Sequence, residues 1–347
     1  MTNRKKLKFS SIVQQLENDF FMNYSFQRIK VLVTSGCNSN CIHCFRSKEK
    51  NTELISFEKL KEIIDFGIMN NCRHFGFSGG EFFTHPNCYD LINYCLSKGV
   101  NIKILTNALQ IDEDYFKKVE KKELISFQVS IDGLENAHDG RRGQGSFHAT
   151  IENVKKLHSL GYMLTGKMVL DTENYRDFPG VLEMPWFESI LVLPLVFYKE
   201  DDWDYDEEIY AMYEEIIQII YRRMLSHNKQ INDCSAYPYE LAIKYNGNVY
   251  PCTEAREHDE YLIGNITDKT LDELLKEYEE SGQEKLECKD VKIEKCIKCR
   301  HKSICNSGCR LRALRFHGNV CAPDPFNCRI YNNEHTNIPI GRLFWGK

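Results

Sequence analysis

Three cysteines near the start of the chain constrain its fold and chemistry more than any other feature. Cys37, Cys41 and Cys44 form a C-x3-C-x2-C run directly after the apolar stretch Ile29–Thr34. Three thiolates this close together can bind three irons of a four-iron cluster and leave the fourth iron open to a small molecule. A zinc site is the alternative, because His43 stands where a fourth zinc ligand is needed.

A glycine-rich segment one β-α unit further on adds a second signature. It ends in Gly79, Gly80 and Glu81, and its two glycines permit close backbone approach to a ligand. Together, the cysteine run and the Gly-Gly-Glu segment resemble the signature of the radical S-adenosylmethionine (SAM) enzymes. The resemblance implies that the three cysteines bind a [4Fe–4S] cluster and that Gly79, Gly80 and Glu81 bind SAM.

Two later segments fit the same family. Ile102–Asn107 and Phe127–Gly133 each read as a strand that ends in polar residues, and a polar segment, His138–Gly143, follows the second. By resemblance, further SAM contacts fall on Thr106, Asn107, Ser130, Asp132 and Arg142. Arg141 is an alternative to Arg142, and ordinary turn chemistry is an alternative explanation for the whole set.

A second cysteine array fills the C-terminal part of the chain. It reads Cys, G-x4-C, a gap, C-x2-C-x5-C-x3-C, a second gap and Cys. Its seven members are Cys234, Cys252, Cys296, Cys299, Cys305, Cys309 and Cys328. Seven thiolates are too many for one four-ligand site and suit two clusters. The pattern resembles the SPASM extension of radical SAM enzymes, which holds auxiliary iron–sulfur clusters.

The SPASM resemblance also implies a ligand set for each of two auxiliary [4Fe–4S] clusters. The first set is Cys296, Cys299, Cys305 and Cys328. The second set is Cys234, Cys252 and Cys309. The fourth position of the second set stays open between Cys288, Cys321, the substrate and no ligand at all. Two zinc ribbons are the alternative to the clusters.

Strand-like and helix-like segments alternate before the second array. The predicted strands are Ile29–Thr34, Phe75–Ser78, Ile102–Thr106, Ser126–Ile131, Met163–Leu170 and Ile190–Val196. Amphipathic helices are predicted from Ser56, over Asn87–Lys98 and over Thr150–Leu160, the last two stopped by glycines. This alternation predicts an α/β fold with a parallel sheet and crossover helices. The family resemblance makes it a partial (β/α)6 barrel followed by a small cysteine-rich SPASM domain.

Five segments are therefore expected along the chain. They are an N-terminal extension (1–27), the radical SAM core barrel (28–198), a bridging helical segment (199–230), the SPASM auxiliary-cluster domain (231–330) and a C-terminal tail (331–347).

Composition excludes several other classes of function. A net charge of −5 over 347 residues gives no basic footprint for nucleic acid, and no apolar run approaches the roughly 20 residues of a membrane span. Fifteen cysteines without an export signal indicate metal binding rather than disulfides, so we expect a cytoplasmic protein. The short basic runs Arg4–Lys8 and Arg310–Arg315 are expected to be solvated or to flank a cluster.

The resemblance also implies an activity. Radical SAM enzymes reductively cleave SAM to a 5′-deoxyadenosyl radical, and this chemistry is supplied by the cofactors. Auxiliary clusters favour net two-electron oxidations, and SPASM enzymes mostly act on ribosomally made peptides. We therefore expect an oxidoreductase that introduces a cross-link, thioether bond or similar change into such a peptide. An external donor such as flavodoxin or ferredoxin would supply electrons, and no single side chain stands out as catalytic.

The segment before the first strand is too short for the leader-recognition domain of many peptide enzymes, so leader binding is expected elsewhere or on a separate protein. Formylglycine formation by an anaerobic sulfatase-maturating enzyme is one alternative, although Thr253 stands where those enzymes commonly carry an aspartate. Oxidation or decarboxylation of a small molecule or a heme precursor is another. A non-enzymatic iron–sulfur electron-transfer or zinc-binding protein would not need the Gly79–Glu81 segment.

Overall fold

The structure is a computed structural model of the 347-residue chain. It describes residues 26–44, 52–194, 239–281, 293–300, 307–324, 328 and 343–346. The predicted bridging segment 199–230 lies outside the described residues. The same holds for three cysteines of the sequence analysis, Cys234, Cys288 and Cys305.

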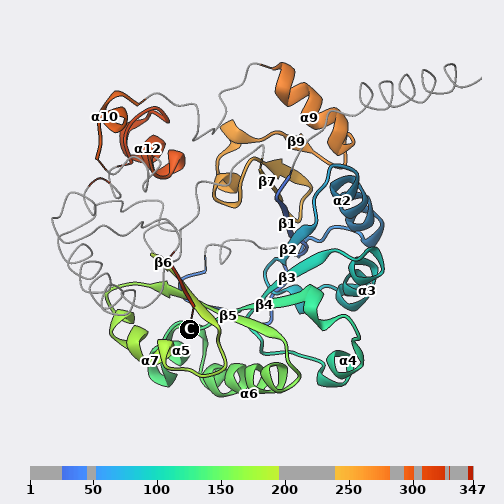
Figure 1. The fold of residues 1–347 in the computed structure, drawn as a ribbon, viewed down its shortest axis with the longest axis vertical. Coiled ribbons are helices and arrows are strands. Elements are labelled where there is room, and N and C mark those ends of the chain that lie inside the picture. Colours follow the sequence, from blue (N-terminus) through green and yellow to red (C-terminus); the bar gives the residue numbers. More distant parts are fainter. Residues whose placement is uncertain are drawn as a thin grey trace, which may run out of the picture.

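A ten-stranded sheet organises the described residues, in the order β10-β6-β5-β4-β3-β2-β1-β7-β8-β9 (Figure 1). Strands β1 to β6 span Arg28–Leu32, His74–Ser78, Asn101–Thr106, Ile125–Ser130, Met163–Leu170 and Ser189–Pro194. Each is parallel to the next along the chain. Because β10 and β9, the two ends of this order, do not pair with each other, the sheet is an open, partial barrel. The predicted α/β fold and all six predicted strands are confirmed.

Helices connect these strands and cover the outer face of the sheet (Figure 1). They are α2 (Phe57–Met69), α3 (Cys88–Lys98), α4 (Glu113–Lys118), α5 (Glu135–Arg142), α6 (Ser146–Ser159) and α7 (Phe178–Leu182), with short 3-10 turns at η1 (Phe82–Thr84), η2 (Lys122–Leu124) and η3 (Tyr175–Asp177). The side chain of Ser56 caps α2 by accepting a hydrogen bond from the backbone of Lys59, and Gly99 ends α3 at a φ of 67°.

Helix α6 begins four residues before the predicted start, at Ser146 rather than Thr150. The reason is the carboxylate of Asp139, which accepts hydrogen bonds from the backbone N–H groups of Gly145 and Phe147, both at 2.7 Å. Because this carboxylate comes from the preceding helix, the usual local capping pattern does not reveal the true helix start.

The main core lies between the sheet and the covering helices. Ile29, Phe75 and Phe77 of the sheet and Leu60 and Leu91 of the helices belong to one buried cluster. Successive side chains of a strand point to opposite faces, so the alternate residues face the interior of the open barrel. There Gly76 stands in register with Lys30 on one side and Lys103 on the other.

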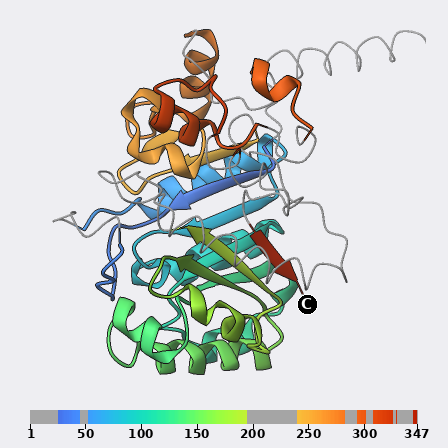
Figure 2. The same cartoon turned by 90° about the vertical axis from the view of Figure 1, so that its left-hand side faces the viewer.

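The region of the second cysteine array continues the sheet directly. Strand β7 (Glu240–Ile243) is parallel to β1, and β8 (Asn248–Tyr250) and β9 (Gly264–Asn265) follow as antiparallel neighbours. Short turns η5 (Thr253–Glu257) and η6 (Asp259–Tyr261) lead to the helices α9 (Leu271–Glu280), α10 (Glu294–Ile297) and α12 (Arg310–His317). Figure 2 shows these orange-to-red elements gathered at the β7–β9 end of the sheet.

The other end of the sheet is completed by a strand within the predicted C-terminal tail. Strand β10 (Leu343–Gly346) is antiparallel to β6, with Leu343 opposite Val192 and Gly346 opposite Ser189. It therefore pairs with the backbone edge that β6 would otherwise expose. Among the described residues, no helix combines the length and the apolar character that crossing a membrane requires.

Candidate active site

The cysteine loop, residues 36–44, starts at the carboxyl end of β1 and is fixed there by backbone contacts. Gly36 donates its N–H to the hydroxyl of Thr34 at 2.9 Å, and its carbonyl accepts the hydroxyl of Thr84 at 3.0 Å. The N–H of Gly80 reaches the carbonyl of Thr34 at 2.7 Å, and that of Glu81 reaches the carbonyl of Gly36 at 2.9 Å. The Gly-Gly-Glu segment is thus joined to the start of the cysteine loop.

Gly79 is required at this contact. A Cβ atom on Gly79 would lie 2.5 Å from the carbonyl oxygen of Thr34, closer than real Cβ atoms come. The absence of a side chain therefore lets β2 bring Glu81 against the cysteine loop.

Glu81 is a buried carboxylate that is surrounded by neutral donors. Its side chain is 2% exposed, and it accepts hydrogen bonds from the hydroxyl of Thr106 and the N–H of Asn107, both at 2.7 Å, and from the N–H of Phe83 at 3.3 Å. Burial raises its pKa, and these hydrogen bonds and the charge of Arg142 oppose the rise. The structure thus brings Glu81, Thr106 and Asn107 together at the carboxyl edge of β2 and β3.

These residues fit the amino group of SAM. A buried carboxylate is costly unless a cation pairs with it, and the three hydrogen bonds described here come from uncharged groups. An ammonium group of a ligand would pair directly with this carboxylate and add a positive charge to that of the nearby Arg142. The buried, hydrogen-bonded Glu81 is therefore the feature of this structure that best matches bound SAM.

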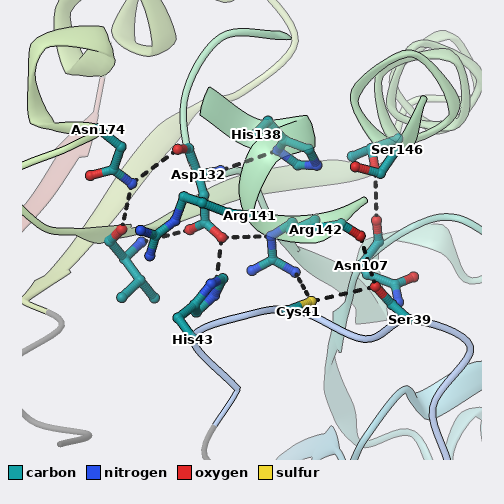
Figure 3. Close-up of polar contacts among 12 residues, drawn as sticks. Ser39, Cys41, His43, Asn107, Asp132, His138, Arg141, Arg142, Ser146 and Asn174 are labelled. Carbon is teal, nitrogen blue, oxygen red and sulfur yellow. Dashed lines mark hydrogen bonds and ion pairs between the residues drawn. The ribbon is translucent and has the colours of Figure 1, made fainter. Parts of the chain in front are cut away.

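A second buried carboxylate, Asp132, anchors the other side of the loop (Figure 3). Its Oδ2 accepts the Nε–H of Arg142 at 2.6 Å and lies 3.2 Å from Nε2 of His43, and its Oδ1 accepts the N–H of Val169 at 2.9 Å. Burial alone would raise the pKa of Asp132, but the charges of Arg142 and His43 and the hydrogen bonds hold that pKa well below its usual range.

Arg142 connects this carboxylate to the cysteine loop. Its Nη1 lies 3.7 Å from Sγ of Cys41, and the hydroxyl of Ser39 lies 3.4 Å from the same sulfur (Figure 3). Arg142 therefore places a positive charge next to a sulfur predicted to bind iron. His43 directs Nε2 toward Asp132, and this contact argues against a zinc site that uses that nitrogen.

The neighbouring Arg141 has a different role. It is 4% exposed and forms an ion pair with Asp171, which follows β5. Its carbonyl accepts the N–H of Ile42 at 3.0 Å, so the end of α5 also holds the cysteine loop. Between the two arginines left open by the sequence, the structure places Arg142 beside the cysteines. Ser130 lies at the carboxyl end of β4 in register with Lys167.

Several site residues were not predicted. His138 is fully buried, and its Nδ1 accepts the N–H of Asp132 at 3.2 Å; burial lowers its pKa to about 4, so it is neutral. Asn174 donates its amide to the carbonyls of Asp132 and Val169 at 3.0 and 2.8 Å (Figure 3). Asn38 accepts the amide of Asn107 at 2.8 Å. In the sequence, the only indication of these roles was that His138, Asn174 and Asn38 are polar residues near the predicted segments.

The three cysteines of the loop differ in exposure. Cys41 and Cys44 are half-buried and Cys37 is exposed. In the part of the chain that is described, no three His, Cys, Asp or Glu side chains already converge as they do around a metal ion. Cys37, Cys41 and Cys44 would hold the cluster at this loop. When bound, the cluster supplies the electron that cleaves SAM.

Five cysteines of the second array lie in the described residues, and their division into two ligand sets stays a prediction. Burial raises the pKa of the Cys328 thiol, and the nearby thiols of Cys296 and Cys299 raise it further. Cys252 and Cys309 each pack against the small core of Ala242, Tyr250, Ala255, Tyr261, Leu311 and Val320. Cys321, one candidate for the open ligand position, is exposed.

Comparison with protein families identifies two domains in the chain. The model of the radical SAM superfamily matches residues 31–184, and that of the SPASM iron–sulfur cluster-binding domain matches residues 234–300. The chain carries a radical SAM domain followed by a SPASM domain. The protein is therefore a radical SAM enzyme whose cofactors are SAM and [4Fe–4S] clusters.

The protein resembles characterised relatives over most of its length. It is 24% identical to Fe-coproporphyrin III synthase of Methanosarcina barkeri, over 84% of this chain and 85% of that protein. It is also 24% identical to the mycofactocin maturase MftC of Mycolicibacterium smegmatis, over 84% and 80% of the two chains. The solved structure of native anSMEcpe with bound AdoMet and the Cp18Cys peptide matches with a TM-score of 0.67 and 19% identity, over 88% and 94% of the two chains.

Proposed function

We propose that this radical SAM/SPASM enzyme oxidatively modifies a ribosomally synthesised peptide by forming a cross-link, a thioether bond or a similar bond. The observation that carries the proposal is the buried Glu81 joined to the cysteine loop at the carboxyl edge of the sheet, in a chain whose residues 234–300 match the SPASM domain. A net two-electron oxidation requires that an electron leaves the substrate radical, and auxiliary clusters provide an acceptor for it.

The comparisons support a peptide as the substrate. One relative is named a maturase, and a solved structure with the same fold holds both AdoMet and a peptide. We further propose that a flavodoxin or ferredoxin supplies the first electron and that a separate protein presents the leader of the peptide.

The site residues of the chain would have different roles in this reaction. Cys37, Cys41 and Cys44 would hold the cluster at which SAM is cleaved. Glu81 would bind the amino group of SAM, and Arg142 would keep a positive charge beside Cys41, 3.7 Å from its sulfur. Holding SAM rigidly in a site that excludes water is the main contribution the protein makes to such chemistry.

Modification of a heme precursor is the second candidate. The observation that favours it is the 24% identity to Fe-coproporphyrin III synthase, which extends over 84% of this chain. Formylglycine formation is disfavoured by Thr253, whose hydroxyl lies 3.3 Å from Oε1 of the buried Glu240.

Mass spectrometry under anaerobic, reducing conditions with SAM distinguishes these candidates. The substrates to offer are short peptides encoded beside the gene, a sulfatase-derived Cys/Ser peptide and an iron coproporphyrin. Loss of two hydrogens from a neighbouring peptide, together with formation of 5′-deoxyadenosine, is the expected result. Decarboxylation of the porphyrin without change in the peptides would replace the proposal with the second candidate. The Cys41→Ala variant serves as the control that forms no 5′-deoxyadenosine.

A further inference from the structure

Asp324 contacts two cysteines that the SPASM pattern assigns to different clusters. Its side chain is 1% exposed, and its Oδ2 accepts the backbone N–H of Cys309 at 2.8 Å. Its backbone carbonyl accepts the N–H of Cys328 at 3.0 Å. Cys309 belongs to the set with Cys252, and Cys328 belongs to the set with Cys296, so one residue lies between the two sites.

Arg312 provides the counter-charge of Asp324. Its Nε and Nη2 donate to Oδ2 of Asp324 at 2.9 and 2.5 Å, and its side chain is 5% exposed. The same carboxylate oxygen therefore receives three hydrogen bonds, one of which comes from the backbone of a predicted cluster ligand. A buried pair of this kind is rigid, because separating its members would leave an uncompensated charge.

The backbone next to Cys309 allows the carboxylate of Asp324 to approach closely. Gly308 has a φ of 74°, and a Cβ atom at this position would lie 2.4 Å from Oδ2 of Asp324. Arg310 holds the other side of the turn, because its Nη1 donates to the carbonyls of Val320 and Ala322, both at 2.8 Å. The position of Cys309 is thus fixed from both sides.

We propose that Asp324 is a positioning residue shared by the two auxiliary cluster sites and that the Asp324–Arg312 pair sets the charge next to both. Asp324 fixes Cys309 through its carboxylate and Cys328 through its carbonyl. The two sites therefore respond together to a change at this residue. The proposal rests on the SPASM ligand assignment and is independent of the substrate in the proposed function.

The charges of the pair predict shifts of opposite sign. A negative charge near a cluster disfavours an added electron, so Asp324→Asn should move the reduction potentials of both auxiliary clusters to more positive values. Arg312→Gln removes the positive charge that pairs with this carboxylate, and both potentials should move to more negative values. Arg312→Lys keeps the charge and should therefore restore potentials close to those of the unchanged protein.

The test is a redox titration followed by electron paramagnetic resonance, on full-length, anaerobically reconstituted protein. Titrating each variant in a Cys41→Ala background removes the signal of the SAM-site cluster, so the two auxiliary signals can be followed alone. Asp259→Asn is the matched control, because Asp259 is an exposed carboxylate in the same region. In the background that keeps Cys41, Asp259→Asn should leave SAM cleavage without substrate unchanged.

A shift of only one auxiliary signal, or shifts of the same sign for Asp324→Asn and Arg312→Gln, would overturn the proposal. Iron analysis provides a second measurement if Asp324→Asn does not retain its clusters. Loss of iron from both auxiliary sites supports a shared positioning role, whereas loss from a single site contradicts it. The substrate assay does not enter this test, so a wrong substrate assignment would leave its outcome unchanged.

Discussion

Replacing Glu81 by glutamine should weaken SAM binding while leaving the stability of the SAM-free protein nearly unchanged. The substitution keeps the size of the side chain and removes its charge. The hydroxyl of Thr106 can reverse its hydrogen bond and accept from the new amide, while the amide oxygen still accepts the N–H of Asn107. The N–H of Phe83, which donates to the same oxygen as Thr106, loses its acceptor, and this loss is offset because a charge no longer has to be buried.

The expected magnitudes follow from the hydrogen bonds. A charged hydrogen bond contributes about 1.5–3 kcal/mol and a neutral one about 1 kcal/mol, so the SAM amino group should lose about 0.5–2 kcal/mol. This corresponds to roughly a 2- to 30-fold higher Kd for SAM. The free energy of unfolding of the SAM-free protein should change by less than about 1 kcal/mol.

Isothermal titration with SAM on anaerobically reconstituted protein measures the first quantity, and thermal unfolding of SAM-free protein measures the second. Glu123→Gln is the control, because Glu123 is an exposed carboxylate in η2, which precedes β4 and so lies at the opposite end of that strand from the site. If Glu81→Gln unfolded at a much lower temperature but bound SAM as tightly as the unchanged protein, the carboxylate would be structural and our reasoning would be refuted.

Three further predictions concern the same site. Gly79→Ala should destabilise the protein by about 1–3 kcal/mol in thermal unfolding, whereas Gly140→Ala, where a Cβ meets nothing within 4 Å, should not. Asp132→Asn should cost about 3 kcal/mol near neutral pH, and because the folded pKa of Asp132 is lowered, its contribution is present above the ordinary value of 3.8 and lost as the pH falls below it. The free energy of unfolding should therefore differ less between pH 7 and pH 3 for Asp132→Asn than for the unchanged protein. Cys41→Ala should abolish 5′-deoxyadenosine formation in a chromatographic assay and retain iron in the SPASM region; full cleavage in this variant would refute the loop assignment.

Local patterns predicted the elements of the fold and the residues of the motifs. Alternating apolar segments revealed the six parallel strands, and the motifs pointed to Glu81, Thr106 and Asn107, which the structure brings together. The sequence analysis grouped Asp132 with the residues expected to contact SAM. In the structure its carboxylate binds Arg142, His43 and Val169. This distinction depends on three chain segments that meet only in the folded protein.

Other features were missed because their partners are distant in the sequence. The basic run at Arg310–Arg315 was expected to be solvated or to flank a cluster, and the first of these expectations is wrong for Arg310 and Arg312, which are 1% and 5% exposed. Arg310 is buried against the carbonyls of Val320 and Ala322, and Arg312 is buried against the carboxylate of Asp324. These partners stand 10 to 12 positions later in the sequence. Similarly, strand β10 is stabilised by its pairing with β6, and its own four residues gave no strand prediction.

The pairing of β7 with β1 has a consequence for biosynthesis. Lys30 and Glu240 contact each other although they are 210 positions apart. As the chain leaves the ribosome, β1 can pair with β2 at once, but its other edge stays uncovered until β7 has been made. The cysteine loop begins at the end of this strand, so a cluster inserted early would enter a sheet whose central strand is only half paired. A truncated chain that ends after β6 would keep that bare parallel edge permanently and should be prone to aggregation.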